Sequence, residues 1–288
     1  MWCKIGSIGV WDLFGSIGII WIWDFIRLSM TQIKINLGGI VPFSTIDWRG
    51  KAAMVIFLRR CPLRCIYCQN YNLLEDDNYV ERQEIEEEIK KNEEFIDAVV
   101  LSGGEPFMQP GAIAAISEYA KKRSLFVAVQ TNGFYPAVIE SMLKEEGNAK
   151  LIDKIFLDVK VPLSDEKFYA KLTKVHNVAE RVRNTLDVCV RAKIDLELVT
   201  TVFKNIVGAG EVKRIAKELE EAGAARCPYV IQQGRAELVP DRAIKEADVF
   251  SHEELKELAA LAYHAADLEN VRIRTREDGE EVIFKRRK

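Results

Sequence analysis

The chain has 288 residues, of which 48% are hydrophobic and 30% are charged. Its net charge of −3 and its pI near 5.8 argue against a nucleic-acid-binding protein, which would usually carry a basic excess. Six cysteines are too few for a secreted disulfide scaffold of this length. We therefore expect a reducing compartment, the cytoplasm, with the clustered thiols free to bind a metal.

Residues 1–29 differ in character from the rest of the chain. The stretch 13–23 is strongly apolar, but eleven residues cannot span a bilayer, which needs about 20. Its length would suit the core of a signal peptide, but no small-x-small cleavage site follows it. We interpret residues 1–29 as an extension before a start at Met30, with a peripheral membrane contact as the alternative. Residues 30–288 contain no repeat or long linker and are predicted to form a single domain.

Short apolar runs alternate with amphipathic stretches from residue 50 onward. Six strands are predicted, at residues 52–58, 96–101, 125–130, 154–159, 196–202 and 228–232. Six helices are predicted, at residues 82–94, 111–122, 136–146, 178–191, 211–222 and 252–267. Residues 271–275 and 282–285 are expected to form a small terminal hairpin around Asp278-Gly279.

This alternation predicts a parallel sheet with right-handed crossovers and with strands that are apolar throughout. Polar motifs follow strands 1, 2, 3, 4 and 6 of the six. Barrels collect functional groups from the carboxyl ends of many strands, whereas doubly wound sheets concentrate them near a switch point. The sequence therefore predicts an α/β fold in the form of an incomplete (β/α)6 barrel.

Three cysteines, Cys61, Cys65 and Cys68, follow the first strand with the spacing C-x3-C-x2-C. Thiolates at this spacing can hold zinc or an iron–sulfur cluster. Zinc would need a fourth ligand, and only a remote histidine could supply one, so that alternative stays open. A [4Fe–4S] cluster on three thiolates leaves one iron without a protein ligand, and that iron can bind a substrate or cofactor. Cys189 lies in an apolar helical stripe and is predicted to be a core residue.

With Tyr67 directly before the third cysteine and Gly103-Gly104-Glu105-Pro106 after the second strand, the sequence resembles the radical SAM enzymes over about residues 36–275. The resemblance implies one [4Fe–4S] cluster on the three cysteines and S-adenosylmethionine (SAM) as the second cofactor. Glycines would allow the backbone to approach SAM closely. The resemblance implies that SAM contacts Tyr67, Cys68, Gln69, Gly104, Glu105, Asp158, Val159, Lys160 and Gln233.

The resemblance assigns these residues to different parts of SAM. Tyr67 and Gln69 would contact adenine, whereas the residues after strands 2 and 4 would bind the methionyl group, with Lys160 as the partner of its carboxylate. Taken alone, Gly-Gly-Glu-Pro could be an ordinary turn, and Asp158 with Lys160 could be a salt bridge at the rim of the barrel.

Residues 37–51 and 61–70 narrow the resemblance to the glycyl-radical-enzyme activating proteins, most similar to those of anaerobic ribonucleoside-triphosphate reductase. This implies reduction of the cluster by a flavodoxin or ferredoxin-type donor, followed by cleavage of SAM to a 5′-deoxyadenosyl radical. That radical would remove a hydrogen atom from a backbone glycine of the partner enzyme. The alternative is a radical SAM enzyme that acts directly on a small molecule or protein.

The sequence departs from the activating proteins in three places. Gln130 replaces an aspartate that helps many of them to bind a monovalent cation, so this site is in doubt. Gln232-Gln233 replaces a histidine near the adenosyl group, although a glutamine amide can still bond a ribose or adenine. No cysteine lies between Cys68 and Cys189, so we expect no ferredoxin-like insert and only one cluster.

Overall fold

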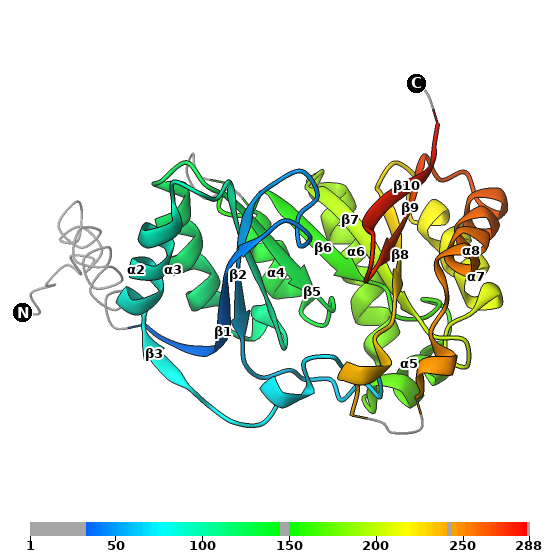
Figure 1. Ribbon diagram of the computed structural model, residues 1–288, viewed down its shortest axis with the longest axis horizontal. Helices are drawn as coiled ribbons and strands as arrows, with labels where there is room; N and C mark the ends of the chain where they lie inside the picture. Colours follow the sequence, from blue (N-terminus) through cyan, green and yellow to red (C-terminus); the bar gives the residue numbers. More distant parts are fainter. Residues whose placement is uncertain (1–32, 145–149, 241–243, 287–288) are drawn as a thin grey trace, which may run out of the picture.

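The computed structural model describes residues 33–144, 150–240 and 244–286, and the predicted extension at residues 1–29 lies outside them. Its strands form one sheet of ten in the order β10-β9-β8-β7-β6-β5-β4-β2-β1-β3 (Figure 1). The strands are β1 (Lys34–Ser44), β2 (Ala53–Leu58), β3 (Tyr79–Glu81), β4 (Ala98–Gly103), β5 (Phe126–Thr131), β6 (Lys154–Asp158), β7 (Asp195–Val202), β8 (Tyr229–Gln233), β9 (Asn270–Thr275) and β10 (Gly279–Lys285). The α-helices are α2 (Arg82–Asn92), α3 (Pro110–Lys121), α4 (Pro136–Leu143), α5 (Glu166–Thr173), α6 (Val178–Ala192), α7 (Ala209–Glu221) and α8 (His252–Ala265).

All six predicted strands and the α/β class are confirmed. Strands β2 and β4 to β8 run parallel in chain order, and a helix follows each of them, which gives six βα units. The terminal hairpin of β9 and β10 is also confirmed, but β9 pairs in parallel with β8 and so becomes a seventh parallel strand.

Strand β1 was not predicted. It pairs antiparallel with β2 along most of its length, and its first residues also pair with β3. Gly38, Gly39 and Pro42 are unusual in a strand interior, which weakens the sequence signal. The register of β1 against β2 shifts twice, next to these residues, as expected for an irregular strand near the edge of the sheet.

The helices cover one face of the sheet and bury most of the core. Amphipathic spacing directs Val182, Leu186 and Cys189 of α6 inward, and Cys189 is fully buried as predicted. The opposite face carries a smaller cluster made by strand residues and Trp48. We call this the inner face, and its apolar members are Trp48, Ala53, Val55, Phe57, Ala98, Val100, Ala128 and Phe156.

The sheet is strongly curved. Arg49, in the loop before β2, lies 3.8 Å from Glu280 of β10, although six strands separate β2 from β10 in the sheet. Because neighbouring strands lie about 4.8 Å apart, a flat sheet would hold β2 and β10 roughly 30 Å apart. The contact therefore requires the sheet to curl around its inner face, as an incomplete barrel does.

Among the described residues, no helix combines the length and the apolar composition needed to cross a membrane.

Candidate active site

The three cysteines lie in a loop that joins the carboxyl end of β2 to the helical layer. Backbone N–H groups of Arg64 and Ile66 donate to Thr173 and Leu172 at the end of α5, at 2.8 and 3.1 Å. Cys61, Cys65 and Cys68 are partly buried free thiols. Burial raises the pKa of Cys61 to about 12 and that of Cys65 to about 11, and it also raises the pKa of Cys68. A metal that binds here must therefore displace the thiol protons.

The glycines of Gly103-Gly104 allow this loop to lie against the end of β4. A Cβ at Gly104 would stand 2.0 Å from the carbonyl oxygen of Arg60, and one at Gly103 would stand 2.2 Å from that of Leu58. Gly103 also has a φ of 117°, in the region that favours glycine. Gly104 N–H then donates to Leu58 at 2.8 Å. These glycines therefore fit the cysteine loop to the sheet.

Glu105 is fully buried, and its carboxylate ties two loops together. One oxygen accepts from Thr131 Oγ1 at 2.8 Å and from Phe107 N–H at 3.1 Å, and the other accepts from Asn132 N–H at 2.8 Å. Burial raises the pKa of Glu105 to about 7, although these hydrogen bonds oppose the shift. The side chain thus braces the ends of β4 and β5.

Asn132 links the Glu105 carboxylate to the cysteine loop. Its side-chain Nδ2 donates to Cys61 Sγ at 3.4 Å. Hydrogen bonds to ligand sulfurs are one of the factors that set cluster potentials. Asn132 was not predicted as a site residue, and its position after β5 was the only signal for it.

Asp158 and Lys160, at the end of β6, meet the cysteine loop at Tyr67. Lys160 Nζ is ion-paired with Asp158 and lies 5.7 Å from the centre of the Tyr67 ring. Burial lowers the pKa of Lys160, but the charges of Asp158 and Cys65 more than offset this, so that its pKa is well above the usual range. The fold therefore brings three predicted site residues together and keeps the lysine charged.

Tyr67 also packs against Phe203, which directly follows β7. The two rings lie 5.8 Å apart with a 36° tilt. Gly234, directly after β8, makes room for Phe203, since a Cβ there would stand 2.2 Å from the ring. Phe203 was missed in the sequence, although the glycine after the sixth strand was a signal of a close approach.

The remaining predicted positions lie along the same strand ends. Gln69 and Cys68 are neighbours in the cysteine loop and are half-buried. Val159 is buried, and its backbone forms hydrogen bonds with β7. Its N–H donates to Val199 and its carbonyl accepts from Thr200 Oγ1. Gln130 accepts a hydrogen bond from Ser102 Oγ at 2.6 Å, so the residue in the place of the expected aspartate is engaged with β4.

Gln233, predicted to contact SAM, is directed away from this group. Its Nε2 donates to Phe250 at 2.7 Å, and its Oε1 accepts from Arg276 N–H at 3.0 Å. Its neighbour Gln232 lies instead on the inner face, where it contacts Thr201 and Arg274. The geometry thus favours Gln232 over Gln233 as a residue that a bound ligand could reach.

The three thiols of the cysteine loop are a donor set that fits an iron–sulfur cluster. No group of three or more His, Cys, Asp or Glu side chains in the described ranges is arranged to hold one metal ion. A cubane cluster binds each thiolate through a different iron, so three sulfurs need not converge on one point. The Tyr67 hydroxyl and Asp158 Oδ1 are buried without a hydrogen-bond partner, next to Lys160. Such orphaned polar atoms fit a site that binds a polar ligand.

Comparison with known proteins identifies relatives of this chain. Residues 55–219 match the model of the Radical SAM superfamily. A Methanocaldococcus jannaschii protein, provisionally named a glycyl-radical enzyme activating enzyme, is 34% identical over 245 residues, which cover 84% of this chain and 97% of that protein. The pyruvate formate-lyase-activating enzyme of Listeria monocytogenes is 28% identical over 51% of this chain and 61% of its own length.

A solved structure supports the fold. The crystal structure of a radical SAM methyltransferase from Sphaerobacter thermophilus superimposes with a TM-score of 0.63 over 79% of this chain and 67% of that one, at 11% identity.

Proposed function

The chain belongs to the radical SAM superfamily, and on that premise we propose that it is an activating enzyme that generates a glycyl radical on a partner protein. Its cofactors are a [4Fe–4S] cluster and SAM. The observation that carries the proposal is the meeting of the cysteine loop with Asp158 and Lys160 at Tyr67. The similarity to the activating-enzyme relative extends over 97% of that protein, which supports the activating function.

We assign the cluster to Cys61, Cys65 and Cys68, with Asn132 as a hydrogen-bond donor to the first thiolate. When bound and reduced, the cluster supplies the electron that cleaves SAM. The SAM contacts are assigned to the end of β6, the Gly-Gly-Glu segment and the cysteine loop.

The SAM site depends chiefly on one cation. Lys160 is buried and charged, and its ammonium group can donate to a carboxylate while it keeps its bond to Asp158. Beside Lys160, Tyr67 presents its aromatic ring and a buried hydroxyl group that has no hydrogen-bond partner.

A protein partner is favoured by the open side of the barrel. Val41 and Phe43 of β1 and Ile46 of the following loop are exposed by 40%, 54% and 58%. Exposed apolar side chains in one segment of the chain favour an interaction surface there. We propose that a glycine-bearing loop of the partner enters between β1 and β10.

The partner that we propose is anaerobic ribonucleoside-triphosphate reductase, with a flavodoxin or ferredoxin-type protein as the electron donor. This choice rests on the resemblance of residues 37–51 and 61–70 to activating proteins of that branch. We propose a cytoplasmic location, where the five free cysteines of the described ranges would stay reduced.

The test is an anaerobic incubation of the reconstituted, reduced protein with SAM and the candidate reductase. A glycyl doublet in the EPR spectrum and formation of 5′-deoxyadenosine are expected. Deoxyadenosine without a glycyl signal would favour the alternative, direct action on another substrate. Cys68→Ala should abolish the cluster and SAM cleavage, whereas the matched variant Cys189→Ala removes a buried core thiol and should retain both.

A further inference from the structure

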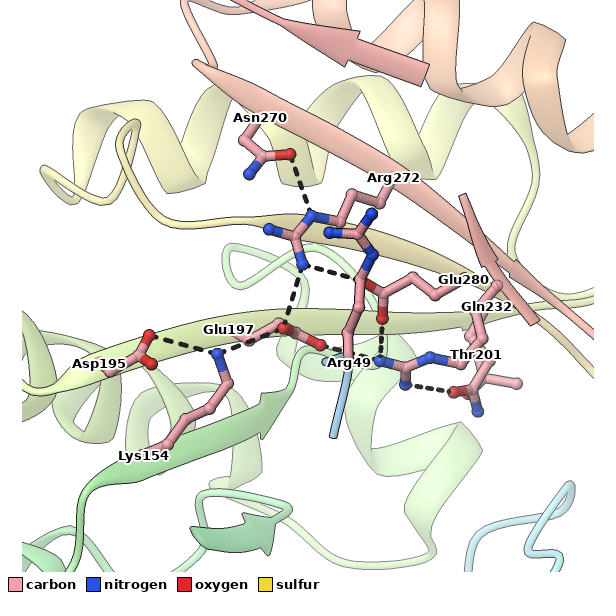
Figure 2. A network of polar contacts seen from close by, with 10 residues as sticks. Arg49, Lys154, Asp195, Glu197, Thr201, Gln232, Asn270, Arg272 and Glu280 are labelled. Atoms are coloured by element: carbon pink, nitrogen blue, oxygen red, sulfur yellow. Dashed lines mark hydrogen bonds and ion pairs between the residues drawn. The ribbon is translucent and has the colours of Figure 1, made fainter. Parts of the chain in front are cut away.

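The inner face of the sheet is apolar on one side and ionic on the other. Strands β2, β4 and β5 present apolar residues there and β6 presents both Phe156 and Lys154, whereas β7, β9 and β10 present charged residues. Figure 2 shows the ionic network around Glu197. The expectation that the six parallel strands are apolar throughout is therefore wrong for β6 and β7, which carry Lys154 and Glu197. The members of the ionic network are Arg49, Lys154, Asp195, Glu197, Arg272, Arg274 and Glu280.

Glu197 lies at the centre of this network and is only 1% exposed. Its carboxylate accepts from Arg274 Nη2 at 2.8 Å and lies 3.4 Å from Lys154 Nζ and 3.6 Å from Arg272 Nη1. Arg274 Nη2 also donates to Glu280 at 2.6 Å. Carboxylates on two different strands therefore hold the Arg274 guanidinium in one place.

This fixed guanidinium determines the orientation of a neighbouring amide. Arg274 Nη1 donates to Gln232 Oε1 at 3.0 Å, and an arginine can only donate hydrogen bonds. The oxygen of the amide must therefore face Arg274, and its NH₂ group must face the other way. That group donates to Thr201 Oγ1 at 3.3 Å. Thr201 is the one acceptor that the described residues offer it, so its second N–H is available to a ligand.

Gln232 lies at the level of the active site. Strand register places it beside Thr201 on β7 and Arg274 on β9, and Thr201 lies two residues beyond Val199, which pairs with Asp158. Its N–H group is thus on the inner face, at the carboxyl end of the strands, on the same side as the Asp158–Lys160 pair.

We propose that Gln232 donates a hydrogen bond to a neutral acceptor of a ligand in the barrel, and that Arg274 is a positioning residue that fixes the amide for this contact. The ligand is SAM or the polypeptide of the partner, since ring nitrogens, ribose oxygens and peptide carbonyls share this chemistry. The inference rests on the proposed function for the identity of the second ligand only.

The decisive variant is Gln232→Glu. A carboxylate of the same shape keeps and strengthens the contact with Arg274, but it removes both N–H donors and faces the ligand with an oxygen. We expect the thermal midpoint of unfolding to be unchanged or higher, while the affinity for the ligand falls about tenfold, the loss that one missing hydrogen bond to a desolvated acceptor gives. The matched control is Gln83→Glu, the same substitution at an exposed position of α2. It should leave both the ligand affinity and the thermal midpoint close to those of the wild type.

Two readouts distinguish the two ligands. Equilibrium dialysis of reconstituted protein with SAM, without partner, measures the first, and the KM for the partner at saturating SAM measures the second. A tenfold weaker SAM affinity assigns the acceptor to SAM, and a tenfold higher KM alone assigns it to the partner. If Gln232→Glu matches the wild type in both, the proposal is wrong. If the wild type binds SAM but makes no glycyl radical, the proposed function fails while the SAM comparison still stands.

Arg274→Lys tests the positioning role. A lysine keeps one positive charge between Glu197 and Glu280 but cannot hold the amide with the same planar fork. We expect about a threefold loss of the same affinity, expressed in KM or dissociation constant rather than kcat. A loss in kcat alone, or none at all with an intact thermal midpoint, would overturn the positioning role.

Discussion

Gly104 and Arg60 lie so close together that an added Cβ on Gly104 would stand 2.0 Å from the carbonyl oxygen of Arg60. This contact, with the hydrogen bond from Glu105 N–H to the same carbonyl at 2.8 Å, joins the end of β4 to the residue that precedes Cys61. The glycine motif and the cysteine motif, which are about forty residues apart in the sequence, are therefore parts of one structure.

Gly104→Ala should displace the cysteine loop, because the atoms that the methyl group meets are backbone and cannot rotate away. We expect a loss of more than half of the bound iron after reconstitution and a destabilisation of about 2 kcal/mol or more. Iron analysis and urea unfolding measure the two effects. Gly210→Ala, in α7 with open space around it, is the matched control and should retain iron and gain up to about 1 kcal/mol.

Gly234→Ala should push the Phe203 ring away from Tyr67 and weaken SAM binding. A double-mutant cycle with Phe203→Leu checks the cause, because a smaller side chain relieves the clash. The double variant is expected to be more stable than the sum of the two single effects by about 1 kcal/mol. Strict additivity would show that the ring contact is not what the alanine disturbs.

Lys160→Met should separate SAM binding from cluster binding. The thiolates are untouched, so iron content and absorption near 400 nm should stay as in the wild type. The affinity for SAM should fall about tenfold to a hundredfold, because a charge-assisted hydrogen bond contributes about 1.5–3 kcal/mol.

Lys51→Met is the control for this prediction. Lys51 also lies over an aromatic ring, 3.6 Å from the centre of Phe126, but at the amino end of the strands. Lys51→Met should therefore bind SAM as the wild type does. Equal SAM affinity in the Lys160→Met protein and the wild type would remove Lys160 from the proposed site.

Glu105 should make the cluster-free protein less stable as the pH rises. Burial raises its pKa to about 7 in the folded state, from an ordinary value near 4.5. Between these values the folded protein holds a proton that the unfolded chain has released, so stability is complete below pH 4.5 and declines as the pH rises through 7. The decline attributable to this group is roughly 1–3 kcal/mol.

Urea unfolding at pH 5 and pH 8 measures this decline. Glu105→Gln does not titrate, so it should be less stable at both pH values yet lose less stability between them than the wild type. The same pH slope in both proteins would contradict the prediction.

The α/β class, the six βα units and the position of the cysteine loop followed from the sequence. The signals behind these predictions are local: the spacing of hydrophobic residues in strands and helices, the glycines that follow helix ends and the spacing of the thiols. They can be recognised without knowledge of the tertiary contacts. The sequence did not show the irregular strand β1, because Gly38, Gly39 and Pro42 are also typical of a loop. It also gave no reason to expect α5, the short helix against which the cysteine loop lies.

The sequence by itself therefore indicated the chemistry of this protein, because three closely spaced thiols indicate a metal or cluster site and, together with Gly-Gly-Glu-Pro, carry the resemblance that implies SAM. Only the tertiary structure decided which side chains face that chemistry. Gln232 and Gln233 are equivalent in the sequence. Because side chains alternate between the two faces of a strand, the register against β7 and β9 places Gln232, and not Gln233, on the inner face. The curvature that brings Arg49 to Glu280 is likewise a property of the whole sheet, to which every strand contributes.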